Sequence, residues 1–177
     1  SGQLGTTLQD LLAEHYEIVS TTRHGNNSNT FNLDITNKIM LKEVLDATKP
    51  DLIINLAAMT NVDLCEEENK ACTALNVHAV SYLADACLSC DAHLIHISTD
   101  FIFDGEDGPY KEDDKPNPLS YYGLSKLKSE EILYKHDVRW TILRTIIVFG
   151  VGENLSKSNI VLWAKRALEK GEQLNII

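Results

Sequence analysis

Short apolar runs alternate with longer amphipathic stretches along this chain, and the two patterns predict different elements. Runs rich in β-branched residues predict strands at 16–21, 51–56, 92–98 and 140–144. Apolar residues at helical spacing predict helices at roughly 4–14, 37–48, 66–90, 121–136 and 158–170. Several of the strands are apolar on both faces, which is typical of a parallel sheet covered by helices. The pattern therefore predicts the α/β class, with a doubly wound parallel sheet of the Rossmann type.

The third predicted helix carries the clearest apolar stripe. Its members, spaced four residues apart, are Ala71, Leu75, Ala79, Leu83 and Cys87. Residues at that spacing share one face of a helix, so the sequence predicts one continuous amphipathic helix across this segment. The acidic run at 66–68 would begin the helix, where the helix dipole favours negative charge.

Composition and charge narrow the possible function classes. With 177 residues and 44% hydrophobic content, the chain can bury one sizeable core, so a single domain is expected. The formal net charge of −10 disfavours binding to nucleic acid or to an anionic membrane, since both require surface cations. No stretch resembles a membrane span or a signal peptide, and a cytoplasmic setting is the expectation.

Cysteine and histidine residues raise the question of a metal site. The cysteines are Cys65, Cys72, Cys87 and Cys90, of which the last two have C-x-x-C spacing. No second such pair and no zinc-finger histidine pair accompanies them, so reduced, buried thiols are the simpler interpretation. His93 and His96 alternate along a predicted strand, which favours packing over metal binding. No metal site is expected.

A glycine-containing loop opens the chain. Ser1-Gly2-Gln3-Leu4-Gly5 leads directly into the first predicted helix. In a Rossmann fold, glycines at this place let the backbone approach a pyrophosphate at a helix N-terminus. A flexible leader before an ordinary helix would look the same.

Both ends of the sequence suggest missing elements. A Rossmann fold has a first strand before its glycine loop, and the chain begins inside that loop. At the other end, 173–177 looks like a strand that has just begun. We therefore expect residues 1–177 to be an NAD(P)-binding Rossmann domain truncated at both ends, with the substrate domain mostly absent.

Cofactor choice is usually set at the end of the second strand, where a carboxylate accepts a hydrogen bond from the ribose of NAD. The segment Thr21-Thr22-Arg23-His24 offers no carboxylate. Arg23 could pair with a 2′-phosphate, so NADP(H) fits better than NAD(H), although a solvated loop arginine is the alternative. Asp34, after the run Phe31-Asn32-Leu33, could reach the adenine or cap the turn before the next helix.

Tyr122 and Lys126 form a second candidate constellation, in the run Tyr122-Gly123-Leu124-Ser125-Lys126. Residues four apart share a helix face, which would place an ammonium near the phenol. A cation there lowers the tyrosine pKa, as suits a tyrosine that donates a proton to a carbonyl. Tyr121 has Ser125 at the same spacing and cannot do this. Taken alone, the pair could be a surface tyrosine over a lysine stem.

Thr99 changes that balance. It follows the predicted strand 92–98, at the carboxyl end where a doubly wound sheet binds ligands. The glycine loop, Thr99 and the Tyr-x-x-x-Lys pattern together resemble the extended short-chain dehydrogenase/reductase family, most closely its reductases of nucleotide-linked deoxysugars. Further matching segments are 98–105, Asn55-Leu56-Ala57-Ala58-Met59-Thr60 and Leu143-Arg144-Thr145. The resemblance spans the entire chain.

The resemblance implies a role for each matched residue. Thr99, Tyr122 and Lys126 would be catalytic, with Tyr122 as the acid and Lys126 also holding the nicotinamide ribose. Together with Arg23, the implied cofactor-binding residues are Gly2, Gln3, Leu4, Asp34, Ile35, Ala57, Ala58 and Thr60. Thr99 and Asp100 would face the substrate. The implied reaction is NADPH-dependent reduction of the 4-keto group of a nucleotide-linked 6-deoxy sugar, and a homodimer is one assembly that the resemblance allows.

Two departures from the family pattern bear on the substrate. The family often has an aromatic residue shortly after Leu-Arg-Thr, where this chain has Ile146-Ile147, so the sugar-contacting surface is expected to differ. A related dehydratase group has Asp-Glu after its threonine, whereas Asp100-Phe101 lacks that base, which favours reduction over dehydration. Two other hypotheses stay open: a sugar-nucleotide epimerase or other oxidoreductase of the extended family, and a non-catalytic regulatory subunit that kept the fold.

Overall fold

The computed structural model describes residues 2–23, 30–149 and 160–173, which fall into two units. The larger unit spans Val19–Ile146, and the smaller unit combines Ser1–Ile18 with Ile147–Ile177. The larger unit holds every predicted strand that the structure describes, together with Thr99, Tyr122 and Lys126.

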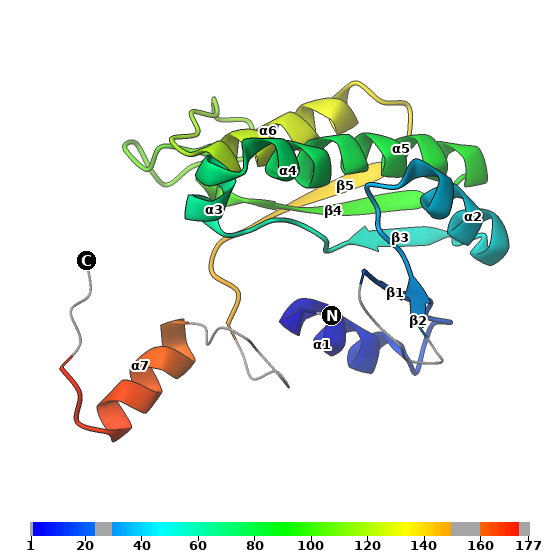
Figure 1. Cartoon of the computed structure of the whole chain (residues 1–177). Helices are drawn as coiled ribbons and strands as arrows, with labels where there is room; N and C mark the ends of the chain where they lie inside the picture. The colour runs from blue at the N-terminus through cyan, green and yellow to red at the C-terminus, as the bar shows by residue number, and fades with distance from the viewer. Residues whose placement is uncertain (1, 24–29, 150–159, 174–177) are drawn as a thin grey trace. The chain divides into compact units, whose positions relative to one another are not determined.

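The centre of the larger unit is a parallel sheet in the order β3-β4-β5 (Figure 1). Its strands are β3 (Leu52–Asn55), β4 (His93–Thr99) and β5 (Trp140–Thr145). Asn55 lies opposite His96, and Thr99 lies opposite Thr145, so the carboxyl ends of all three strands meet at one edge of the sheet. That edge is where an open parallel sheet binds its ligands.

A second parallel pair is formed by β1 (Ser20–Thr22) and β2 (Thr30–Asn32). The expected single sheet is therefore divided in two among the described residues. In the doubly wound order the first strand lies between the second and the fourth. By that order, β1 corresponds to the second strand and β3 to the fourth. The strand predicted at 16–21 is also shorter, because Tyr16, Ile18 and Val19 are exposed and lie outside any strand.

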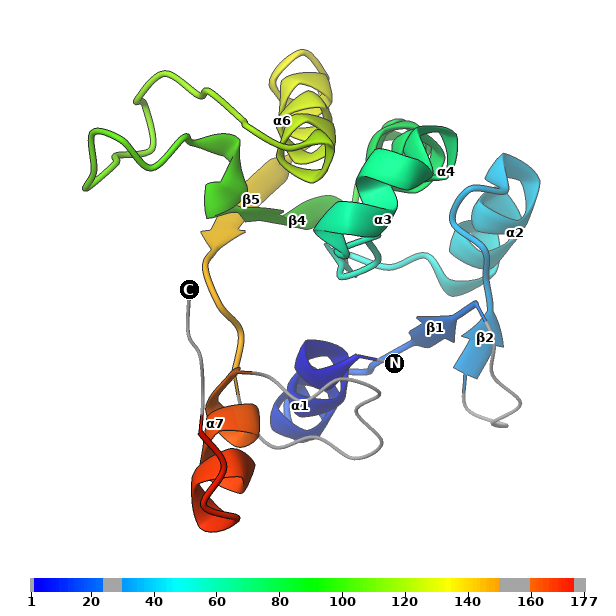
Figure 2. The ribbon, with the colours of Figure 1, turned by 60° about the vertical axis from the view of Figure 1, so that its left-hand side comes forward.

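Helices α2 (Lys38–Thr48) and α6 (Tyr121–Tyr134) confirm the predicted elements, and α5 (Ala79–Cys90) forms the last part of the helix predicted over 66–90. They cover one face of the three-stranded sheet, together with the segment before α5 (Figure 2). Asn37 and Ser120 cap the starts of α2 and α6 by accepting backbone N–H groups. The core between helices and sheet is apolar, and its largest fully buried members are Leu41, Val80, Leu94 and Leu133.

The helix predicted over 66–90 is interrupted. The segment contains α3 (Val62–Glu67), α4 (Asn69–Thr73), a π-helical turn at Ala74–His78, and then α5. Asn61 caps α3, so the acidic run 66–68 ends that helix instead of starting one. The π turn inserts an extra residue and shifts the buried face, which leaves Ala71 exposed and buries Cys72 and Asn76 instead.

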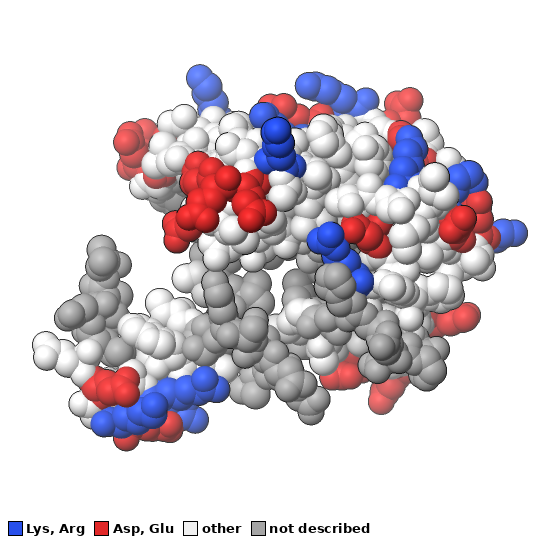
Figure 3. All heavy atoms as spheres, viewed as in Figure 1, with Lys and Arg blue, Asp and Glu red and all other residues white. Residues whose placement is uncertain are grey.

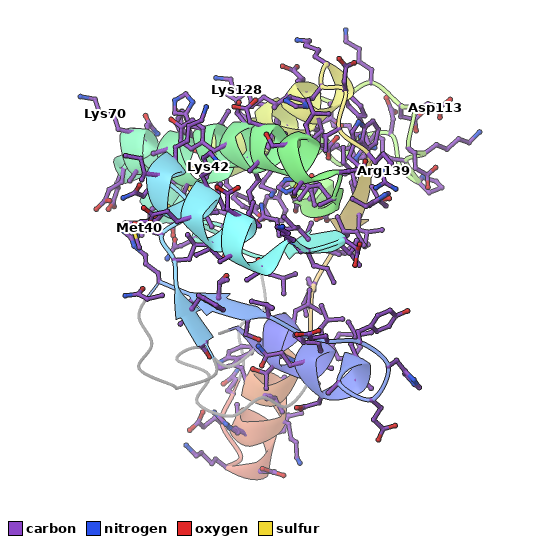
Figure 4. The ribbon with its side chains drawn as sticks, turned by 90° about the vertical axis from the view of Figure 1, so that its right-hand side faces the viewer. Met40, Lys42, Lys70, Asp113, Lys128 and Arg139 are labelled. Atoms are coloured by element: carbon purple, nitrogen blue, oxygen red, sulfur yellow. The ribbon has the colours of Figure 1, made fainter. Side chains whose placement is uncertain are left out.

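Charged side chains line the outer surface of the helical layer. Lys42 on α2, Lys70 on α4 and Lys128 on α6 are exposed there, as is Arg139 before β5 (Figure 4). The smaller unit contains α1 (Gln3–Leu12) and α7 (Ile160–Glu169), close to the predicted bounds. Among the described residues, no helix has the length and apolar character that a bilayer span requires. The strand expected at 173–177 lies mostly outside the described residues.

Candidate active site

Helix α6 carries Tyr122 and Lys126 inward. Ser120 fixes the start of the helix by accepting the N–H of Gly123 at 3.1 Å. Tyr122 is half-buried, and Lys126 is only 2% exposed. Lys128, two residues later on the opposite face of α6, is exposed (Figure 4). The alternative of a tyrosine packed over a surface lysine therefore does not fit, because the lysine stem and its amine both lie in the interior.

Gly123 lets α6 approach the end of β4. The 3-10 turn η2 (Asp100–Ile102) follows β4 directly, and a Cβ on Gly123 would lie 2.2 Å from the Phe101 carbonyl oxygen. Only a residue without a side chain allows this contact. The ring of Phe101 also packs edge-on against Tyr122, with 5.8 Å between the ring centroids. Sequence reasoning missed Gly123, although a glycine in the first turn of a helix is a usable signal.

Thr99 ends β4 beside Tyr122. Its hydroxyl accepts the Phe101 N–H at 3.2 Å and donates to the Asp100 carboxylate at 3.1 Å. The Thr99 side chain also acts on Tyr122 and lowers the pKa of its phenol. The structure therefore brings Thr99, Asp100 and Tyr122 together at the carboxyl edge of the sheet.

The pKa of Tyr122 differs from the expectation in its direction. Burial is the largest influence and raises this pKa above its usual value, and the influence of Thr99 only partly opposes it. Lys126 does not contribute, because its amine is turned toward His96, with 3.1 Å between Nζ and Nε2. The expected lowering of the phenol pKa by Lys126 is thus not seen in this arrangement.

Burial also acts on Lys126 itself. Loss of solvation lowers the pKa of its ammonium to about 8, and the nearby carboxylate of Glu130 partly opposes that change. Glu130 has no exposed surface and is held by Arg144 on β5, with 2.7 Å between carboxylate and guanidinium. Arg144 also donates to the Glu112 carbonyl at 2.8 Å, so the Leu-Arg-Thr motif connects α6 to the loop before it.

Asn76, in the π turn, links α6 to the loop after β3. Its amide accepts the Met59 N–H at 2.8 Å and donates to the Met59 carbonyl at 3.0 Å and to Ser125 at 2.9 Å. This pattern holds the segment that contains Ala57, Ala58 and Thr60 close to α6. Sequence reasoning missed Asn76, whose signal was a polar residue inside an apolar helical stretch.

The loop residues expected to bind the middle of the cofactor lie at the same edge. Ala57 donates its N–H to the Asn55 side chain at 3.1 Å, directly after β3. Ala57 and Thr60 are exposed and Ala58 is half-buried. Small and accessible residues beside Thr99 and Tyr122 leave room for a ligand at this edge.

Arg23 and Asp34 lie side by side at the ends of β1 and β2. Arg23 Nε is 3.0 Å from an Asp34 carboxylate oxygen, and the Arg23 side chain is 62% exposed. The other Asp34 oxygen accepts the backbone N–H and hydroxyl of Thr36, as expected for a residue that caps a turn. The sequence showed no carboxylate beside Arg23; the pairing of β1 with β2 supplies one, because Asp34 follows β2. Ile35 is half-buried against the core, and His24 lies outside the described residues.

Gly2, Gln3 and Leu4 belong to the smaller unit. Gly2 is the N-cap of α1 and provides no side-chain cap, and a Cβ there would meet nothing within 4 Å. Open space before uncapped N–H groups suits an anion such as a pyrophosphate. The start of α1 thus fits the phosphate-binding role that the sequence predicts for Gly2, Gln3 and Leu4.

The cysteines and the possible metal ligands form no second reactive site among the described residues. Cys65, Cys72 and Cys87 are buried and unpaired, and burial raises the pKa of Cys65 and Cys87 to about 12. Within the described part of the chain, no three His, Cys, Asp or Glu side chains are grouped to hold a metal. The acidic side chains of α3 form an exposed group (Figure 3), of which Glu66 accepts the Tyr121 N–H at 2.6 Å.

A protein-family model matches the amino-acid sequence of this chain. The model described as the RmlD substrate binding domain covers residues 1–177. The chain belongs to this family. A curated relative, dTDP-4-dehydrorhamnose reductase of Aggregatibacter actinomycetemcomitans, is 40% identical over 169 residues, or 93% of this chain and 55% of the relative.

Two further relatives show how varied such proteins are. Methionine adenosyltransferase 2 subunit beta of Danio rerio is 37% identical over 136 residues, or 77% of this chain and 42% of the relative. A solved dTDP-4-dehydrorhamnose reductase of Bacillus anthracis, in complex with NADP, is 32% identical with a TM-score of 0.82 and covers 96% of this chain and 57% of that one. The Rossmann-type fold expected from the sequence is confirmed. The chain spans about half the length of the curated relatives it matches.

Proposed function

We propose that the protein reduces the 4-keto group of a nucleotide-linked 6-deoxy sugar to an alcohol, with NADPH as reductant. One observation carries the proposal: Thr99 and Tyr122 lie together at the carboxyl edge of the sheet, with Lys126 buried one turn further along α6, in a chain 40% identical to a dTDP-4-dehydrorhamnose reductase. The reaction would belong to dTDP-deoxysugar biosynthesis in the cytoplasm. The reduced, buried thiols are compatible with that compartment.

The residues divide the work of a carbonyl reduction. NADPH, when bound, would supply the hydride for the carbonyl carbon. Tyr122 would donate its phenolic proton to the carbonyl oxygen, and Thr99, beside Tyr122, would orient that oxygen. The high pKa of Tyr122 keeps the phenol protonated, so it is ready to act as the acid. Lys126 would hold the cofactor ribose, and with a pKa lowered to about 8 by burial it is still largely an ammonium at neutral pH.

NADP(H) is the preferred cofactor in this proposal, with NAD(H) as the second choice. A relative with the same fold holds NADP, and Arg23 presents an exposed guanidinium at the end of β1. The Asp34 carboxylate beside it would repel a 2′-phosphate, but the ion pair with Arg23 and the two bonds from Thr36 neutralise and fix it. The preference for NADPH over NADH is therefore expected to be modest.

The test is direct. The full-length protein, mixed with NADPH and a dTDP-linked 4-keto-6-deoxy sugar, is expected to consume NADPH and yield the sugar alcohol in equal amounts. A sugar-nucleotide epimerase would keep its nicotinamide bound and show no net consumption. Absence of NADPH consumption with such substrates would count against the proposal.

A second candidate function is a non-catalytic subunit that retains the dinucleotide site. It is favoured by the similarity to methionine adenosyltransferase 2 subunit beta. In that case the protein would bind NADPH, yet wild type and Tyr122→Phe would bind it and a partner protein equally and neither would turn over. A homodimer is the assembly we propose for the reductase, and light scattering of the full-length protein would test it.

A further inference from the structure

A chain of buried polar side chains lies directly beneath the Lys126 amine. His96 on β4 contacts this amine, and Asn55 at the end of β3 and Ser129 on α6 both contact His96. None of the three is more than 6% exposed. His96 is at the centre of this chain and contacts all of the other members. Because buried polar groups are nearly always hydrogen-bonded, their partners decide which nitrogen of His96 carries the proton.

Asn55 determines the protonation of Nδ1 of His96. Its side-chain oxygen accepts the Ala57 N–H at 3.1 Å, so its NH2 group points the other way. That NH2 group lies 3.2 Å from Nδ1 of His96. An amide NH2 can only donate, so Nδ1 must be the unprotonated, accepting nitrogen.

Ser129 indicates in turn that Nε2 of His96 carries the proton. Its hydroxyl donates to the Lys126 carbonyl at 2.6 Å, which uses its one proton. The hydroxyl oxygen is 2.9 Å from Nε2 of His96 and therefore accepts from that nitrogen. Two independent contacts thus place the single proton of neutral His96 on Nε2.

The same Nε2 lies 3.1 Å from Nζ of Lys126. A nitrogen that carries a proton has no lone pair to offer an ammonium, but the proton that Ser129 accepts can be shared with the lone pair of an uncharged amine. We propose that His96, through the Nε2 proton that Asn55 and Ser129 hold in place, positions the Lys126 amine and favours its uncharged form. The consequence for turnover rests on the proposed reduction, whereas the proton arrangement does not.

The surroundings of Lys126 agree with this assignment. Burial is the largest influence on His96 and lowers its pKa to about 3, so the ring is neutral at neutral pH. On its own helix Lys126 is near Glu130, and Cys72 on α4 is the titratable group that influences it from the other side. Glu130 is paired with Arg144, and its carboxylate offsets only part of the effect of burial on the pKa of Lys126.

The first test reads the proton directly. In the full-length protein labelled with 15N-histidine, the His96 signals are assigned by their loss in His96→Gln. We expect Nδ1 unprotonated and Nε2 protonated between about pH 6 and pH 8, well above the lowered His96 pKa. A proton on Nδ1, or a charged ring, would overturn the inference, whatever the enzyme assay shows.

The second test moves the His96 proton from Nε2 to Nδ1. Asn55→Asp places an acceptor at Nδ1, which moves the proton there and frees the Nε2 lone pair for a Lys126 ammonium. The NMR titration of Lys126, assigned by Lys126→Arg, should shift upward by about one pH unit or more. The added charge acts by itself as well, so the same substitution is measured in a His96→Leu background.

The double-mutant comparison separates charge from proton position. A larger upward shift with His96 present than in the His96→Leu background supports the inference, and equal shifts overturn it. If Asn55→Asp does not fold, the histidine NMR of the wild type still decides. Failure of the proposed reductase activity would leave both NMR results unaffected, so the two proposals fail independently.

Discussion

Substitution of Gly123 tests how α6 is placed against β4. In Gly123→Ala, the added Cβ would lie 2.2 Å from the Phe101 carbonyl oxygen and 3.2 Å from the Pro118 side chain. Ordinary contact requires at least 3.4 Å, so α6 or the η2 turn must move by about 1 Å. The obstacle is backbone, which cannot rotate away as a flexible side chain would.

Two opposing energies set the magnitude. Alanine is favoured over glycine within a helix by up to about 1 kcal/mol. Overpacking of a rigid interior costs about 1–3 kcal/mol and occasionally more. Because the contact is with a fixed carbonyl, we expect the upper part of that range, and a net loss of about 2 kcal/mol in the free energy of unfolding. The same shift would displace Tyr122, and a displacement of about 1 Å can reduce turnover about 100-fold.

Urea unfolding of the full-length protein measures the stability change, and steady-state NADPH oxidation measures the change in turnover. Lys128→Ala on the same helix is the matched control, because Lys128 is exposed and should alter stability by no more than about 0.5 kcal/mol. A Gly123→Ala protein as stable as wild type, or more stable, would refute the close packing of α6 on Phe101.

Three further outcomes follow from the site. Arg144→Gln removes the partner of fully buried Glu130 and should lower the free energy of unfolding by about 3–5 kcal/mol in urea titrations; an unchanged midpoint would contradict a buried ion pair. Arg23→Ala should weaken NADPH binding about tenfold while leaving NADH binding nearly unchanged in calorimetry, and equal losses would exclude a contact with the 2′-phosphate. Because burial lowers the pKa of Lys126 to about 8, kcat/KM should be high below that pH and decline as the pH rises through it; a profile flat to pH 10 would show that the ammonium is not required.

Sequence patterns predicted the elements whose character is local. Helix α6, with the spacing of Tyr122 and Lys126, follows from helical periodicity, whereas its cap at Ser120 was seen only in the structure. The three strands of the central sheet were also predicted to within a few residues, since each is a short apolar run between turns. The placement of Thr99 at a ligand-binding edge followed from the rule for parallel sheets.

Features that depend on tertiary contacts were not predictable in this way. The π turn in the third helix forms around Asn76, whose partners Met59 and Ser125 are far away in sequence. Asp34 reaches Arg23 only because β1 and β2 pair in parallel. The orientation of Lys126 toward His96 likewise depends on the packing of α6 on β4, and no spacing rule contains it.

The central claim, proton donation by Tyr122 during carbonyl reduction, is tested most directly by a pair of neighbouring tyrosines. NADPH oxidation with a dTDP-linked 4-keto-6-deoxy sugar is compared among wild type, Tyr122→Phe and Tyr121→Phe, since the Tyr121 hydroxyl bonds Thr73 at 2.7 Å, away from Thr99. We predict a loss of at least about 100-fold in kcat for Tyr122→Phe and nearly full activity for Tyr121→Phe. Equal activity of the two variants, or none in the wild type, would contradict the account.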